Sequence, residues 1–228
     1  MDLTINGVSL ASLGVIVENR TNFVKPRRRH STQLTEGVDG ASIEEFGYEG
    51  YSLLYKITLT DSTKFNQITS LLDGDVILEV ADDPGNFFYA KVLEGLAYSP
   101  LSIWRKANIE FYVYDPFRYV KEENDVTITT FPTVISYAGS AVSYPLLKIA
   151  GSGLVTITLN GVPFTYNFDT PYIYLECMPG ADRGAYYLGT LKNRRKTGGY
   201  PYLTPGNNNL SVSGTVTEIV LSKRTRFL

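Results

Sequence analysis

The chain has 228 residues, a length that fits two compact β-rich domains better than one small module. Its 43% hydrophobic and 19% charged residues exclude a disordered chain, and no run approaches the roughly 18 apolar residues that a membrane span needs. The formal net charge of -2 argues against a general polyanion binder, whatever local basic patches exist.

A single cysteine and a single histidine limit the chemistry that the chain can perform. Cys177 cannot form an internal disulfide, and His30 cannot supply a multi-histidine metal site. We therefore expect neither a zinc site nor a disulfide scaffold. The opening residues, MDLTINGVSL, lack a basic segment followed by an apolar one, so we expect no signal peptide and a protein that stays in the compartment where it is made.

The abundance of Tyr, Phe, Thr, Val and Ile predicts a mainly β protein, because these side chains suit a half-buried pleated surface. Two stretches in the first half alternate between apolar and polar residues, as half-buried strands do. In 51–60 the predicted buried face consists of Tyr51, Leu53, Tyr55, Ile57 and Leu59. In 103–114 it consists of Ile103, Ala107, Ile109, Phe111 and Val113.

One short helix is predicted between these strands, at about 62–73. Its apolar residues recur at helical spacing, at Phe65, Ile68, Leu71 and Leu72, and should lie on the sheet. Asp61 or Ser62 suits the N-cap, and Gly74 suits the C-terminal stop. Two shorter strands are expected at 76–81 and 87–93, joined by a turn at 82–86.

The composition of the sequence changes after the Asp115-Pro116-Phe117 turn. A charged stretch at 121–125 is followed by a Ser/Thr/Gly-rich segment, so we place a first domain at 1–125 and a second at 136–228. In the second domain Asn160-Gly161 separates two apolar runs, which predicts a hairpin with a type I′ turn. Further strands at 172–176 and 215–222 predict an all-β domain.

A basic run and an acidic stretch follow each other near the N-terminus. They are either two solvated loops or a pair of complementary surfaces that make an interface. The residues of this candidate interface are Lys25, Arg27, Arg28, Arg29, Glu36, Asp39, Glu44, Glu45 and Glu49.

Catalytic signals are weak, and we predict no catalytic, metal or cofactor site. His30 is far in sequence from Cys177, which is most simply a small buried residue at a strand end, and no nucleophile-elbow motif occurs. Asp169 and Glu176 are paired-carboxylate candidates only because strands can bring distant acids together. Asp73-Gly74-Asp75 lacks the other ligands of an EF-hand loop, and phosphate-binding glycine motifs are absent.

Five stretches together resemble the distal tail protein (Dit) family of long, non-contractile-tailed bacteriophages, the siphophages. The resemblance covers nearly the whole chain, and its more specific parts are the Asp-Pro-aromatic turn and a Pro-Gly-Asn turn, since both need special backbone geometry. The five stretches are LTINGVSLASLGVIVE at 3–18, IEFYVYDPFRY at 109–119, PLLKIAGSG at 145–153, YPYLTPGNNNL at 200–210 and TEIVLSKRTRFL at 217–228.

The resemblance implies a fold and a role. The expected fold is an N-terminal sandwich or barrel-like β domain with one short helix, followed by a galectin-like β-sandwich. The expected protein is a virion component of the tail tip or baseplate, made in the host cytoplasm, whose first domain forms a sixfold ring. Tail tube protein would lie on one face of this homo-hexamer and the tail-associated central protein on the other. The compact second domain leaves no room for long inserted arms, so docking of a receptor-binding protein stays open.

In such a ring the basic run of one subunit could meet the acidic stretch of the next. The resemblance implies neither a membrane partner nor a specific nucleic acid. Two other readings stay open. A non-catalytic carbohydrate-binding module would show an exposed aromatic platform, although the single Trp104 lies in the first domain. A glycosidase would lose turnover when one acid is removed.

Overall fold

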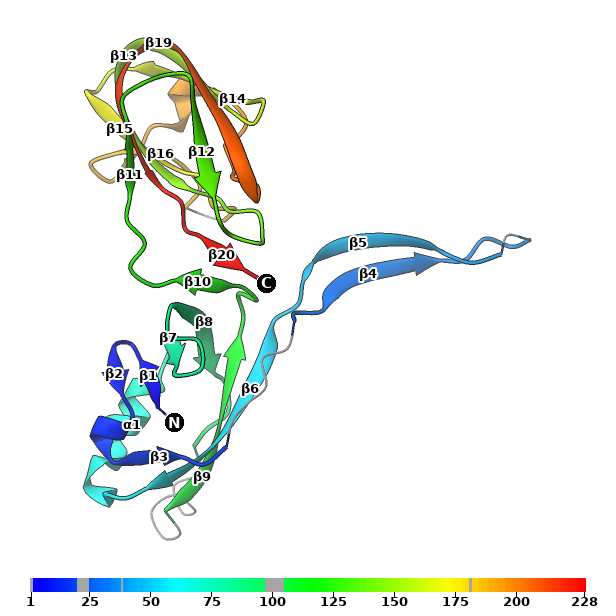
Figure 1. Cartoon of the computed structure of the whole chain (residues 1–228), viewed down its shortest axis with the longest axis vertical. Coiled ribbons are helices and arrows are strands. Elements are labelled where there is room, and N and C mark those ends of the chain that lie inside the picture. The colour runs from blue at the N-terminus through cyan, green and yellow to red at the C-terminus, as the bar shows by residue number, and fades with distance from the viewer. Residues whose placement is uncertain (1, 20–24, 38, 97–104, 181) are drawn as a thin grey trace. The chain divides into compact units, whose positions relative to one another are not determined.

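The structure is a computed structural model that describes residues 2–19, 25–37, 39–96, 105–180 and 182–228 (Figure 1). It divides into two compact units, which we call unit 1 (1–118 with 228) and unit 2 (119–227). Both are built mainly from strands, with one short α-helix among the described residues, so the predicted fold class is confirmed. Within the described ranges no helix is long and apolar enough to cross a membrane.

Unit 1 combines short strands with a single helical segment. Its helical elements are the 3₁₀ turns η1 (Ala11–Leu13) and η2 (Ser62–Lys64) and the helix α1 (Phe65–Leu71). Its strands are β1 (Leu3–Ile5), β2 (Val8–Ser9), β3 (Val15–Val17), β4 (Arg28–Gln33), β5 (Ser42–Tyr48), β6 (Tyr51–Leu59), β7 (Asp75–Val80), β8 (Asn86–Val92) and β9 (Lys106–Val113).

Most of these strands form one antiparallel sheet in the order β2-β1-β7-β8-β9-β6-β3. Strands β6 and β9 pair along most of their length, from Tyr51 opposite Val113 to Thr58 opposite Lys106. The predicted faces of both strands are confirmed, because Leu53 and Ile57 in β6 and Phe111 in β9 are almost fully buried in one apolar core. Ile103 lies outside the described residues.

The predicted helix is present but starts as a 3₁₀ turn. Asp61 caps it by accepting a hydrogen bond from the Thr63 amide at 2.9 Å, and Gly74 follows its end with a φ of +77°. Ile68 and Leu72 are buried in the same core as the sheet. The helix therefore covers the sheet with its apolar stripe, as predicted.

Unit 2 begins earlier than the expected second domain. The segment 126–137, which lies mostly outside both expected domains, forms two of its strands. The elements are β10 (Arg118–Val120) at the junction, then β11 (Val126–Ile128), β12 (Thr133–Tyr137), β13 (Leu146–Leu159), β14 (Val162–Phe168), β15 (Tyr172–Glu176), β16 (Gly184–Tyr187), β17 (Thr190–Leu191), η4 (Asn193–Arg195), β18 (Lys196–Gly198), β19 (Gly206–Ser222) and β20 (Arg226–Phe227).

Two long strands connect the two layers of the sandwich in unit 2 (Figure 1). The first half of β13 pairs with β15, and its second half pairs with β14. The end of β19 pairs with β11, and its start pairs with β12. Register shifts between Ala150 and Gly151 and between Ser152 and Thr156 bend the pair β13–β19, so each strand leaves one layer and enters the other.

The Asn-Gly hairpin and the Pro-Gly-Asn stretch meet in space. Asn160 and Gly161 have φ values of +51° and +78°, as the predicted type I′ turn requires. The side-chain amide of Asn160 donates to Oδ1 of the fully buried Asn208 at 2.6 Å. The side-chain amide of Asn208 donates to the carbonyls of Thr204 and Gly206. The Pro-Gly-Asn stretch is therefore a bend that opens β19, and its hydrogen bonds hold the hairpin.

The charged stretch at 121–125 is part of unit 2. Both carboxylate oxygens of Glu123 accept hydrogen bonds from Thr225, one of them from its backbone amide at 2.7 Å. Arg226, which follows Thr225 in the sequence, is 8% exposed, and its guanidinium lies over the ring of Tyr144. These contacts fasten the C-terminal strand to unit 2.

We predict that Phe111→Ala lowers the free energy of unfolding of unit 1 by about 3 to 5 kcal/mol, through lost burial and a residual cavity. Phe111 is fully buried, and its ring centroid lies 5.9 Å from that of Tyr55. Denaturant unfolding of the full chain measures the loss. The control is Leu54→Ala on the opposite face of the sheet, where the side chain is 45% exposed. A loss below about 1 kcal/mol for Phe111→Ala would contradict the face assignment.

The domain boundary is tested by two fragments that share a C-terminus. We expect 119–228 to fold alone, whereas 136–228 lacks β11 and most of β12 and so loses the buried Ile128 and Ile135. Removing two buried isoleucines should lower the free energy of unfolding by about 4 kcal/mol or more. Equal urea midpoints for the two fragments would show that β11 and β12 are dispensable.

Candidate functional site

Strands β4 and β5 form a two-stranded antiparallel sheet that is separate from the main sheet of unit 1 (Figure 1). We call residues 25–49, which contain both strands, the arm. Every residue of the two strands is exposed except Ser31 and Tyr48, which are half-buried. The two stretches are solvated, but parts of them form paired strands, where that interpretation expected loops alone. Apolar periodicity missed the strands because neither face of the arm is buried within the chain.

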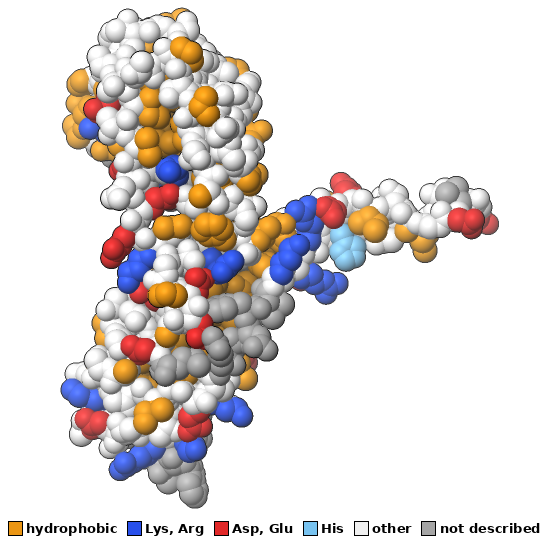
Figure 2. Space-filling model, in the orientation of Figure 1, with side chains coloured by type: hydrophobic (Ala, Val, Ile, Leu, Met, Phe, Trp, Pro, Cys, Tyr) orange, Lys and Arg blue, Asp and Glu red, His pale blue; other side chains and the backbone are white. Residues whose placement is uncertain are grey.

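The arm brings together all nine residues of the candidate interface. Arg28 and Arg29 lie on β4, and Glu44 and Glu45 lie on β5. Figure 2 shows the basic side chains grouped near the base of the arm, with acidic and hydrophobic side chains farther along it. The remaining members flank the strands: Lys25 and Arg27 precede β4, Glu36 and Asp39 lie between the strands, and Glu49 follows β5.

One basic and one acidic residue of this set pair within the arm itself. The Arg28 guanidinium donates to the Glu45 carboxylate and, at 2.7 Å, to the Tyr48 hydroxyl. It also lies 4.8 Å from the centroid of the Tyr48 ring. The hydrogen bonds to Tyr48 and Glu45 raise the pKa of Arg28. Tyr48 in turn packs edge-on against Phe117, with ring centroids 5.7 Å apart. This contact connects the base of the arm to the rest of unit 1.

The other seven charged residues of the set make no ion pair with any described residue of the chain. Three are cations (Lys25, Arg27 and Arg29) and four are carboxylates (Glu36, Asp39, Glu44 and Glu49). The arm also exposes apolar side chains, since Leu34, Ile43 and Phe46 are 81%, 62% and 48% exposed. An isolated two-stranded hairpin is at best marginally stable in water, so this composition favours a partner surface.

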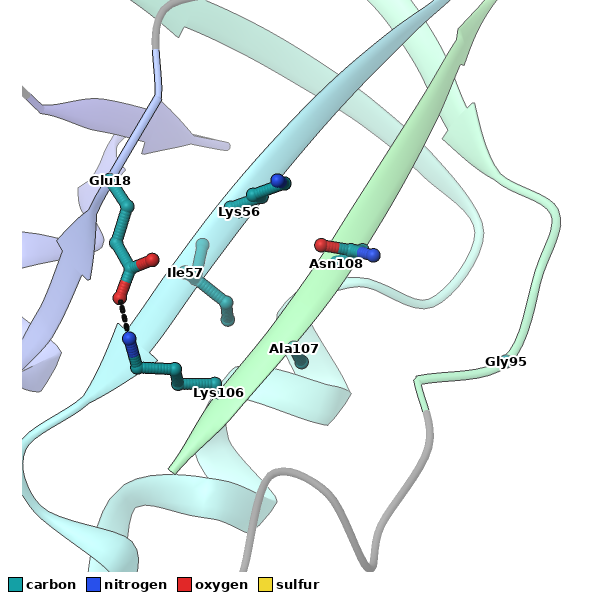
Figure 3. A pocket seen from close by; sticks show the side chains of 7 residues that line it. All are labelled: Glu18, Lys56, Ile57, Gly95, Lys106, Ala107 and Asn108. Carbon is teal, nitrogen blue, oxygen red and sulfur yellow. Dashed lines mark ion pairs between the residues drawn. The ribbon is translucent and has the colours of Figure 1, made fainter. Parts of the chain in front are cut away.

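A hollow of about 540 Å³ lies beside β6 and β9 (Figure 3). At its rim Glu18 and Lys106 form an ion pair at 3.1 Å. Hydrogen bonds from Thr58 and Lys106 lower the pKa of Glu18. The described lining has no side chain that pairs a nucleophile with a base, so the Glu18 carboxylate here is a structural partner of Lys106 and Thr58.

The residues considered for catalysis lie apart or are neutralised. His30 is exposed on β4, whereas Cys177 is fully buried at the end of β15, as predicted for a small core residue. Lys192 and Arg195 pair with Asp169, and Arg224 binds both oxygens of Glu176. Among the described residues no group of three or more His, Cys, Asp or Glu could hold a metal ion.

The carbohydrate-binding alternative depends on exposed aromatic rings, and unit 2 has a group of three tyrosines of which Tyr174 is exposed and Tyr172 and Tyr187 are half-buried. The Tyr172 ring lies 5.8 Å from that of Tyr174 and 5.2 Å from that of Tyr187, and Lys148 lies over it at 5.1 Å. All three rings of the group are tyrosines. The single tryptophan of the chain, Trp104, lies outside the described residues. The rings contact each other edge-on, and Lys148 lies over one face of the Tyr172 ring. Sugar binding therefore stays an untested alternative.

The fold of the chain is that of phage tail-tip proteins of known structure. The match to the crystal structure of the Dit (gp 19.1) protein of phage SPP1, which is described there as a paradigm of the hub adsorption apparatus in Gram-positive infecting phages, has a TM-score of 0.71 and 18% identity. It covers 100% of this chain and 99% of the SPP1 protein. The resemblance that the sequence motifs indicate is thus confirmed at the level of fold.

Two structures of the phage p2 baseplate in its activated conformation are also similar. The match to a chain of the calcium-bound structure has a TM-score of 0.54 and 10% identity and covers 100% of this chain and 99% of that one. For the strontium-bound structure the TM-score is 0.52 and the identity 9%, and the coverage is 97% and 98%. No family model matches the sequence, and no curated protein is similar to it in sequence.

We predict that Cys177 does not react with a disulfide reagent in the native protein. Burial raises the pKa of its thiol to about 12, so at pH 8 only about one molecule in 10,000 carries the thiolate that reacts. The reagent should therefore give no colour over an hour in native buffer and one equivalent in concentrated guanidinium chloride. Rapid stoichiometric reaction of the native protein would contradict the buried position.

Proposed function

We propose that the protein is a structural hub of a siphophage tail tip and acts as a ring of six copies. The observation that carries the proposal is the match, over the whole length of the chain, to a hub protein and to baseplate chains. A likeness limited to one unit would indicate only a widespread sandwich. Since both units and their order are shared, the likeness extends to the complete architecture.

The arm is the proposed contact between neighbouring copies. The seven charges that make no ion pair with a described residue include both signs, so the arm is complementary to a second arm or to the region around its base. A head-to-tail contact of this kind repeats around an axis and makes a ring when the rotation between neighbours closes. Isolated exposed pairs add only about 0 to 1 kcal/mol each, so the contact gains strength from repetition and from burial of Leu34, Ile43 and Phe46.

In this proposal the ring joins tail tube protein on one face to the tail-associated central protein on the other. Receptor-binding proteins would attach at the baseplate, directly or through the central protein. The role is positional, so it needs no nucleophile, metal or cofactor. The chain would be made in the cytoplasm of the host and incorporated in the virion.

The ring is tested by the mass of the full chain in solution. We expect light scattering at rising protein concentration to approach about 6 × 25.3 kDa, and negative-stain images to show a sixfold ring. A chain that stays monomeric at all concentrations, or that closes with another number of copies, would overturn the hexamer.

The role of the arm is tested by reversing charges that make no ion pair with any described residue. Arg27→Glu with Arg29→Glu should shift the mass toward the monomer at low salt, because both residues are exposed charges of this kind. Arg28 is left intact because it pairs with Glu45 and Tyr48 inside the arm. Adding Glu44→Arg and Glu49→Arg to the same chain should restore the ring.

Lys56→Glu with Lys64→Glu, which makes the same charge change outside the arm, is the matched control. Circular dichroism checks that each variant is folded. If the arm variant keeps the mass of the wild-type chain at both low and high salt, the arm is not the interface.

A further inference from the structure

A second charged surface lies on unit 2, in the segment that crosses between the layers of the sandwich. Strand β17 ends the layer that contains β15 and β16, and β18 pairs with β14 in the other layer. The residues between them therefore pass over one open side of the sandwich. Lys192, Arg194 and Arg195 lie in this segment, Lys196 begins β18, and Arg183 directly precedes β16. We call these five cations the basic crossover.

The basic crossover is held in place by the backbone. The Lys192 amide donates to the Ala185 carbonyl at 2.7 Å, and the side-chain oxygen of Asn193 accepts from the Ala185 amide at 2.8 Å. Gly184 leaves the space that Asn193 occupies, since a Cβ there would lie 2.7 Å from the Asn193 amide. The cations are therefore presented by a fixed turn, which limits the entropy lost when a ligand binds.

Few anions neutralise these five cations. Lys192 and Arg195 share one carboxylate oxygen of Asp169, at 3.1 and 3.0 Å. Burial raises the pKa of Asp169, but the two cations outweigh this effect and lower it, so the carboxylate stays charged. Asp182 precedes Arg183 in the sequence, and Glu176, which lies opposite Gly184 in the sheet, is bound by Arg224. Arg194 is exposed and makes no ion pair with any described residue.

Two of the cations are held against an aromatic ring and not against an acid. The guanidinium carbon of Arg183 and the Nζ of Lys196 lie 4.1 and 4.0 Å from the centroid of the Tyr200 ring. The Nε of Arg183 is buried and has no hydrogen-bond partner among the described residues. Two like charges near one ring repel each other, so an anion placed between them would be stabilised.

The basic crossover accounts for the whole charge excess of unit 2. Residues 119–227 contain ten cations and seven carboxylates: the five cations of the basic crossover are counted with Asp169 and Asp182, and the other five cations with the other five carboxylates. Unit 1 has an excess of acidic residues, which hides this patch in the net charge of -2. The net charge of the whole chain therefore does not reveal the local excess of cations on unit 2.

We propose that the basic crossover binds a phosphodiester polymer without bases, such as a chain of glycerol phosphate units. Guanidinium groups match the geometry of phosphate oxygens, and three of the five cations are arginines. Protein–protein interfaces are enriched in arginine but depleted in lysine, and two of the five cations here are lysines, so a folded acidic partner is the weaker match. Nucleic acid would need a free aromatic face for its bases, and the Tyr200 ring is half-buried and in contact with two cations.

The test titrates the full chain with poly(glycerol phosphate), with single-stranded DNA of equal charge and with neutral dextran. We expect the first to bind, dextran not to bind, and DNA to bind no more tightly than the first. The logarithm of the binding constant should fall with the logarithm of salt concentration with a slope of about -3 if four phosphates are contacted. Arg194→Gln with Arg195→Gln should weaken binding at least about tenfold at low salt and make that slope shallower by about 1.4.

The control is Lys64→Gln with Lys223→Gln, which removes the same charge outside the basic crossover and should bind like the wild-type chain. Circular dichroism checks the fold, and light scattering of the same samples separates this result from the fate of the proposed ring. Three results would each overturn the proposal: no binding of poly(glycerol phosphate) at low salt, equal loss in the control and in the Arg194/Arg195 variant, or markedly tighter binding of DNA.

Discussion

The bend that β13 and β19 share is the constraint on which unit 2 depends. These two strands pair with each other through both layers, so they can stay paired only if both bend at the same level. Glycines make this possible: a Cβ on Gly151 would lie 2.6 Å from the Thr215 carbonyl, and one on Gly214 would lie 2.4 Å from the Leu154 carbonyl. The bend places the other strands on two facing layers, and the apolar core forms between them.

The two sheets of unit 1 differ in their cores. The main sheet has an apolar core within the chain, whereas the arm has no core of its own. The faces of β6 and β9 are buried by the helix and by other strands, so these strands are stable within one chain. The arm has two exposed faces, and its internal contacts concentrate at the base, around Arg28, Glu45 and Tyr48. A hairpin of this kind gains stability when it packs against another surface, which the proposed ring would supply.

The two charged surfaces differ in a way that separates their proposed roles. The arm carries both signs, which suits a contact between identical subunits because each copy supplies what the next one lacks. The basic crossover carries five cations, of which only Lys192 and Arg195 make an ion pair with a described carboxylate, and this suits a ligand that is itself polyanionic. Neither surface contains the paired nucleophile and base of an enzyme, and the buried Cys177 and exposed His30 lie on different units.

Local patterns in the sequence determined the mainly β class, the buried faces of β6 and β9, the capped helix and the Asn160-Gly161 turn. Each depends on residues a few positions apart, so alternation, caps and turn residues report it directly. Only the tertiary structure decided that the basic and acidic stretches pair as one arm, that Glu123 holds the C-terminal strand and that 206–222 is one bent strand. It also brought Arg183 and Lys196 to the same ring, that of Tyr200. These features depend on long-range pairing, and a strand without a buried face has no apolar period by which sequence could reveal it.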